Sequence, residues 1–164
     1  LQKINPSANP VLYLVGPVAE PYQAELLNIA RNLGIELHVR FLGYVSGSER
    51  GDWLQAADLF LLPSSGESFG LAFLEAIACG TFCLVSPHVG AIEFAPLSHF
   101  AVAPLEARAW ANHCERLVTL QNPAPPVLHR EISALFSVDR IAEQWLRVYA
   151  ELDPELQSIV GEHP

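Results

Sequence analysis

The sequence predicts an α/β fold, a doubly wound parallel sheet with helices on both faces. The first observation behind this prediction is that short apolar runs alternate with longer segments whose apolar residues recur at helical spacing. The second is that Gly, Pro or Ser residues follow the apolar runs, as in loops after strands. The third is composition: hydrophobic residues make up 51% and charged residues 16% of the 164 residues, which suits one domain with a large core.

Five apolar runs are expected to form the strands: residues 11–15, 37–42, 59–62, 82–86 and 100–103. Turn-forming residues end the first three, with Gly16 after the first, Gly43 after the second and Pro63 after the third. A short run without regular polar alternation is typical of a strand covered on both faces, which is the situation in a parallel sheet. The resulting fold is Rossmann-like.

Three helices are expected between these strands, over residues 20–33, 49–57 and 71–79. Gly34 suits the C-terminal end of the first helix. Ser46 or Ser48 supplies an N-cap for the second helix, which is expected to bury Trp53 and Leu54.

Two more helices are expected in the last third of the sequence. Residues 106–120 carry apolar residues at helical spacing, and a proline-rich loop follows. Ser137 or Asp139 then caps a final helix. We therefore expect one domain over residues 1–152, followed by a frayed tail at residues 153–164.

Charge and cysteine content narrow the possible partners and the compartment. The net charge of −9 makes nucleic acid an unsuitable partner. Cys79, Cys83 and Cys114 lie in apolar context without metal-ligand spacing, which predicts buried, reduced thiols in a cytoplasmic protein and no metal site. No apolar run is long enough to span a bilayer.

A carboxylate on the third helix is the main candidate for a functional residue. If residues 71–79 are helical, Glu75 falls within an apolar stripe formed by Leu71, Leu74 and Ala78. Burying an unpaired carboxylate costs on the order of several kcal/mol, so a partner is expected. Candidates are a hydrogen-bonding ligand, a basic side chain or a cluster of backbone amides.

The segment before this helix favours a ligand. In doubly wound sheets, ligands bind beyond the carboxyl ends of the strands, where the loops here are residues 16–19, 43–47, 63–69 and 87–90. Gly70 permits close approach, and the free N–H groups at a helix start attract anions. A phosphate above Gly70 and Leu71, flanked by Glu67, would leave Glu75 one turn deeper to accept from hydroxyl groups. The alternative without a ligand has Glu67 capping the helix and Glu75 paired with an Arg; both remain open.

The stretch ADLFLLPSSGESFGLAFLEAIACGTFCLVSPHVGAIE, residues 57–93, resembles the donor-binding half of the family-4 (group 1) retaining glycosyltransferases. These enzymes have the two-domain GT-B architecture. Their pattern has two glutamates separated by seven residues in a Glu-x-Phe-Gly-Leu context, matched here by Glu67 and Glu75. The likeness covers roughly residues 11–152, and the further matches are Glu-Ala-x-Ala-x-Gly-Thr at 75–81, Ser86, Gly90 to Glu93, VRFLGYVS at 39–46 and FSVDRIAEQWLRVYAEL at 136–152.

This resemblance implies roles for the matched residues. Glu75 would bind the ribose hydroxyls of a nucleoside-diphosphate sugar, and Glu67 would be the catalytic residue that contacts the transferred sugar. The other implied donor-binding residues are Phe69, Gly70 and Leu71, whose amides would meet the sugar and phosphates, and Gly43, Tyr44 and Val45, which would lie near the base. Neither a metal nor another cofactor is implied.

The resemblance also implies that this is the C-terminal half of a GT-B fold, incomplete at its N-terminus. The family's acceptor-binding N-terminal domain, and the Arg/Lys pair that neutralises the diphosphate, precede the matched region. Arg40 or Arg50 could stand in for that pair. The complete enzyme would transfer a hexose-type sugar to an unknown acceptor, with peripheral membrane association left open, whereas this chain alone would be inactive.

Other functions remain open on the sequence. One is a non-catalytic module of GT-B type that binds a nucleotide sugar or a protein partner. Another is a sugar-nucleotide epimerase of GT-B type or a receiver-like signalling domain. A receiver needs a phosphorylatable Asp at a strand end, and no Asp occupies the carboxyl end of a predicted strand.

Overall fold

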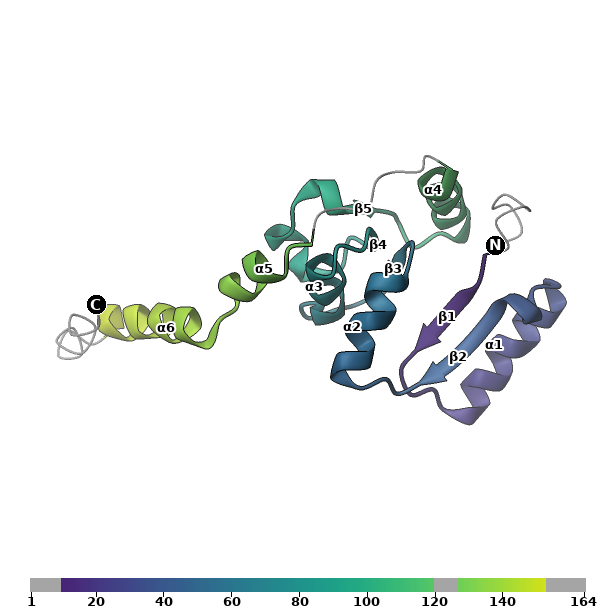
Figure 1. The fold of residues 1–164 in the computed structure, drawn as a ribbon, viewed down its shortest axis with the longest axis horizontal. Helices are drawn as coiled ribbons and strands as arrows, with labels where there is room; N and C mark the ends of the chain where they lie inside the picture. Colours follow the sequence, from purple (N-terminus) through teal and green to yellow (C-terminus); the bar gives the residue numbers. More distant parts are fainter. Residues whose placement is uncertain (1–9, 120–126, 153–164) are drawn as a thin grey trace. The chain divides into compact units, whose positions relative to one another are not determined.

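The structure, a computed structural model, describes residues 10–119 and 127–152. The chain forms two compact units, Leu1–Val127 and Leu128–Pro164 (Figure 1). The predicted proline-rich loop and the predicted tail at residues 153–164 lie outside the described residues.

The first unit contains the strands β1 (Leu12–Val15), β2 (Val39–Gly43), β3 (Phe60–Leu62), β4 (Cys83–Val85) and β5 (Phe100–Val102). β1 pairs in parallel with β2, and β4 pairs in parallel with both β3 and β5. Parallel pairing with helices on both faces confirms the predicted α/β class (Figure 1). The strands nevertheless pair within two sheets, β1-β2 and β3-β4-β5, where one continuous sheet was expected.

The helices of the first unit are α1 (Glu20–Asn32), α2 (Gly47–Ala56), α3 (Leu71–Ala78) and α4 (Ala107–Thr119), with short 3₁₀ turns η2 (Glu36–His38), η3 (Gly90–Phe94) and η4 (Leu97–His99). The four longer helices confirm the predicted ones to within two residues. The strand expected from residue 37 begins at Val39, because the chain first makes the η2 turn, where Leu37 is exposed.

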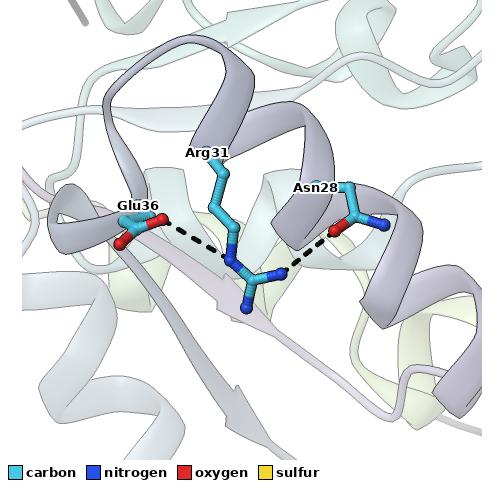
Figure 2. Close-up of polar contacts among 3 residues, drawn as sticks. All are labelled: Asn28, Arg31 and Glu36. Carbon is cyan, nitrogen blue, oxygen red and sulfur yellow. Dashed lines mark hydrogen bonds and ion pairs between the residues drawn. The ribbon is translucent and has the colours of Figure 1, made fainter.

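The end of α1 is tied to the η2 turn by an arginine. Gly34 follows the helix at φ +66°, in the role expected for it. Arg31 Nη1 donates to Asn28 Oδ1 at 3.0 Å, and its Nε lies 3.5 Å from Glu36 Oε2 (Figure 2). The two side chains of this ion pair are 58% and 50% exposed, so its contribution to stability is small.

The core of the first unit lies between α3 and the β3-β4-β5 sheet. Its most buried apolar residues are Phe73, Ala76, Ile77, Cys83, Leu84, Val85, Val89, Ala91 and Ala103. The Phe73 ring meets Phe100 edge-on at 5.4 Å between centroids.

Trp53 and Leu54 are only half-buried, so the prediction that α2 buries them is wrong. One side of Trp53 packs on the half-exposed Tyr13 of β1, at 5.0 Å between ring centroids.

The second unit consists of α5 (His129–Leu135) and α6 (Val138–Leu152). The Arg140 N–H donates to Ser137 Oγ at 3.3 Å, so Ser137 supplies the cap that the sequence left open between two residues. The sequence did not predict α5, a helix of less than two turns.

Candidate functional site

Glu75 lies on the outer face of α3 and not within its apolar stripe. The buried face consists of Phe73, Leu74, Ala76, Ile77 and Ala78. Leu71, one turn before Glu75, is 66% exposed. The expected stripe is therefore wrong at Leu71: the sheet-facing side of α3 is set by Phe73 and Ile77, so Leu71, Glu75 and Cys79 turn away from the sheet.

The carboxylate of Glu75 has a basic partner in this structure. Arg50 Nη2 lies 2.8 Å from Glu75 Oε1, and the two side chains are 48% and 36% exposed. Arg50 comes from the start of α2, whereas Glu75 is in the middle of α3. The predicted burial of an unpaired carboxylate is therefore wrong, and the Arg pairing that the sequence left open is present.

The loops after β3 and β4 are joined at the start of α3. Glu67 and Val89 form an isolated parallel bridge, which holds the two loops side by side. Ser86 Oγ donates to the Ser64 carbonyl at 2.6 Å, and the Ala91 N–H donates to the Phe69 carbonyl at 2.8 Å. The structure thus places the predicted residues Glu67 and Phe69 on a well-connected loop.

Gly70 is the N-cap residue of α3 and has a backbone conformation that other residues rarely adopt. Its φ is +102°, and its carbonyl accepts from the N–H groups of Phe73 and Leu74. A Cβ at this position would lie 2.6 Å from Val89 Cγ1. The backbone conformation and the packing against Val89 therefore require glycine at position 70, whether or not a ligand also approaches it. The N-cap position is held by Gly70, which has no side chain to cap the helix, and capping by Glu67 stays a prediction.

We expect Gly70→Ala to lower the free energy of unfolding by about 1–3 kcal/mol, because the strained φ and the contact with buried Val89 both oppose a Cβ. Urea unfolding of the variant and the wild type measures this difference. Gly66→Ala is the matched control, since Gly66 lies on the same loop with nothing within 4 Å of its added Cβ. Equal losses in the two variants would show that the Gly70 conformation is not strained.

The segment Gly43 to Val45 follows β2 and leads into α2. The Gly43 carbonyl accepts from the Gly16 N–H at 2.8 Å, which ties the loops after β1 and β2 together. Tyr44 is 81% exposed, whereas Val45 is buried. α2 begins two residues later and carries Arg50. The ion pair between Arg50 and Glu75 therefore links α2, which follows this segment, to α3, which follows Glu67 and Gly70.

The predicted site residues thus fall into two groups. The first group lies at the start of α3 and in its first turns, and the second precedes α2: Glu67, Phe69, Gly70, Leu71 and Glu75, and Gly43, Tyr44 and Val45. The sequence left open that an Arg pairs with Glu75 but did not identify that residue as Arg50, which was considered only as a stand-in for the missing cations. No local signal identified that pair, because its two members are 25 residues apart and meet only through the packing of α2 on α3.

The three cysteines are free, as predicted, but only Cys83 is buried, whereas Cys79 and Cys114 are partly exposed. Burial raises the pKa of Cys79, Cys83 and Cys114, and the nearby Glu75 carboxylate raises the pKa of Cys79 further. All three are therefore neutral thiols at pH 7, which argues against a cysteine nucleophile.

Within residues 10–119 and 127–152, no three or more His, Cys, Asp or Glu side chains gather in a way that could hold a metal ion. None of the helices described there combines the length and apolar character needed to cross a membrane.

Comparison with protein families finds one match over most of the chain. The model of the family described as "Glycosyl transferases group 1" matches residues 2–128. The D-inositol 3-phosphate glycosyltransferase of Actinosynnema mirum is 32% identical over 148 residues, covering 86% of this chain. D-inositol 3-phosphate glycosyltransferase 2 of Catenulispora acidiphila is 45% identical over 78 residues, covering 48% of this chain. The matches span only 35% and 18% of the lengths of these relatives.

Solved structures share the fold. Alr3699/HepE of Anabaena, crystallised in complex with UDP, matches with a TM-score of 0.74 and 25% identity, covering 91% of this chain and 42% of that protein. Sucrose-phosphate synthase from Thermosynechococcus elongatus matches with a TM-score of 0.70 and 27% identity, covering 86% of this chain and 38% of that protein.

Proposed function

This chain belongs to the group 1 glycosyl transferases, and we propose that it forms the donor-binding domain of a retaining glycosyltransferase that transfers a hexose-type sugar. One observation carries the proposal: Glu67, Gly70 and Glu75 are arranged around the start of α3, beyond the carboxyl end of β3. This is where ligands bind in doubly wound folds, and a helix start offers free N–H groups to a phosphate.

In this proposal, different residues bind different parts of the donor. The N–H groups of Phe69, Gly70 and Leu71 bind the diphosphate and the sugar, and the 66% exposure of Leu71 leaves the helix start accessible. Glu75 accepts hydrogen bonds from the ribose hydroxyls, and Glu67 contacts the transferred sugar. Gly43, Tyr44 and Val45 lie along the base, where the exposed Tyr44 ring is available for contact.

The donor is proposed to be a uridine nucleotide sugar, because the solved neighbour from Anabaena was crystallised with UDP. The relatives are longer than the matched segments, which supports a further acceptor-binding domain in the complete enzyme. Transfer requires the acceptor to be held in line with the donor, so this chain alone binds the donor without transferring it. Free cysteines support a cytoplasmic location.

Titration of the chain with UDP tests this proposal. We expect a dissociation constant in the range of about 0.1–1 mM, because the site lacks the contacts of the acceptor-binding half. The affinity should be the same in EDTA, since no metal is proposed to take part. Inorganic pyrophosphate is the control for charge alone and should bind more weakly than UDP. Absence of UDP binding up to about 10 mM, or pyrophosphate binding equal to it, would contradict a nucleotide site.

A further inference from the structure

The ion pair between Arg50 and Glu75 joins two helices at the proposed donor site. We propose that Arg50 is a positioning residue, which holds the Glu75 carboxylate in the orientation that receives the ribose of the donor. This inference rests on the proposed function of Glu75.

The two partners are carried by helices that are fastened to each other. At the start of α2, the Arg50 N–H donates to the Ser46 carbonyl at 2.7 Å, as in a regular first turn. At the other end of α2, the Leu54 carbonyl accepts from Thr81 Oγ, just beyond the end of α3. Thr81 is buried and Leu54 is half-buried, so this link is partly shielded from water. The packing of α2 on α3 therefore fixes where the Arg50 backbone lies relative to Glu75, and the arginine side chain spans the remaining distance to the carboxylate.

Glu75 needs such a support because of its place on α3. It lies on the outer face, and its neighbours one turn away are Leu71 and Cys79, whose side chains do not fix a carboxylate. An unsupported Glu at a half-exposed position samples several rotamers, and a ligand would have to select one of them. The contact with Arg50 Nη2 at 2.8 Å selects one in advance.

The pairing leaves acceptor capacity for a ligand. A carboxylate has two oxygens with about four lone-pair sites, and Arg50 engages Oε1. Among the residues that the structure describes, Arg50 is the one polar partner given for the Glu75 carboxylate, which leaves Oε2 available to hydroxyl donors. A neighbouring hydroxyl pair, such as the 2′ and 3′ hydroxyls of a ribose, is the donor group that this remaining capacity suits.

The ion pair between Arg31 and Glu36 provides a matched control on the same chain. It has a similar exposure, 58% and 50%, and a longer distance of 3.5 Å (Figure 2). Glu36 precedes the first residue of β2, so this pair lies at the end of the strand opposite to the proposed site. Arg31→Met removes the same charge without touching Glu75.

The experiment compares the affinities of UDP and of its 2′,3′-dideoxy analogue for wild type, Arg50→Met, Arg50→Lys, Glu75→Gln and the Arg50→Met/Glu75→Gln double variant. We expect Arg50→Met to weaken the binding of UDP about fivefold and to leave the affinity for the dideoxy analogue unchanged. Arg50→Lys should recover part of the loss, because it keeps the charge without the planar fork. Within the Glu75→Gln background, Arg50→Met should have no further effect, and Arg31→Met should behave as wild type.

Three results would overturn the inference for Arg50. If Arg50→Met weakened the binding of UDP and of the dideoxy analogue equally, Arg50 would act on the phosphates. If the variant bound UDP more tightly than wild type, Arg50 would compete with the ligand for Glu75. If the affinity for UDP did not change, the ion pair would have no role in ligand binding. Failure of the proposed function gives a different result, in which wild type does not bind UDP or Glu75→Gln binds it as well as wild type. Arg50→Lys preserves the test if Arg50→Met does not fold.

Discussion

Replacing Glu67 by Gln in the complete transferase is expected to lower the rate of sugar transfer about 100-fold, while the affinity for UDP changes less than twofold. Glu67 lies before the start of α3, on the loop joined to Val89, and we propose that its carboxylate reaches past the phosphate site towards the sugar. The substitution keeps the size of the side chain but removes the charge that the transferred sugar would meet. Initial rates at saturating donor, with UDP affinity measured in parallel, separate these two effects.

Glu25→Gln is a suitable control, because Glu25 is an exposed carboxylate on α1 outside the predicted site loops. It should leave both the transfer rate and the UDP affinity unchanged. If Glu67→Gln reduced the rate and the UDP affinity by equal factors, Glu67 would serve binding in general and would not act on the sugar.

Glu75→Ala is expected to weaken UDP binding tenfold or more. Loss of a charge-assisted hydrogen bond typically costs about 1.5–3 kcal/mol, which corresponds to roughly a tenfold to a 100-fold change in affinity. Calorimetric or spectroscopic titration of the variant with UDP measures the change.

The ligand itself supplies the control for this prediction. An analogue of UDP that lacks the 2′ and 3′ hydroxyls should bind wild type and Glu75→Ala with similar affinity, because it cannot use the carboxylate. Unchanged affinity of Glu75→Ala for UDP would remove Glu75 from the ribose site. An equal loss for both ligands would mean that Glu75 supports the structure of the site as a whole.

The order of strands and helices could be predicted from the sequence because it depends on local signals. Gly34 follows α1, as expected from the preference of glycine at this position. Ser46 stands at the N-cap of α2, one of the two positions expected, but its side chain makes no capping hydrogen bond. The fold class follows from that order, since alternating strands and helices pair in parallel.

The details of the candidate site depend on packing that no local signal records. The periodicity of α3 did not show which side faces the sheet, because nearly all of its residues are apolar; the contact of Phe73 with Phe100 decides this. As a result, Leu71 was expected inside and lies outside. The pairing of Arg50 with Glu75 was missed for a similar reason, since it requires two separate helices to pack together.

The division of the strands into two sheets was also not predicted. Right-handed crossovers favour neighbouring strands, but they do not determine whether β1 and β3 exchange hydrogen bonds.

The most direct test of a donor site at the start of α3 is a titration of isotope-labelled chain with UDP-glucose, followed amide by amide by NMR. We predict that the largest shifts occur at Phe69, Gly70, Leu71 and Glu75, with a second group at Tyr44 and Val45, and that Arg31 and Glu36 at the opposite end of β2 stay unchanged. Saturable shifts confined to other parts of the chain, or no shifts at millimolar donor, would contradict the account.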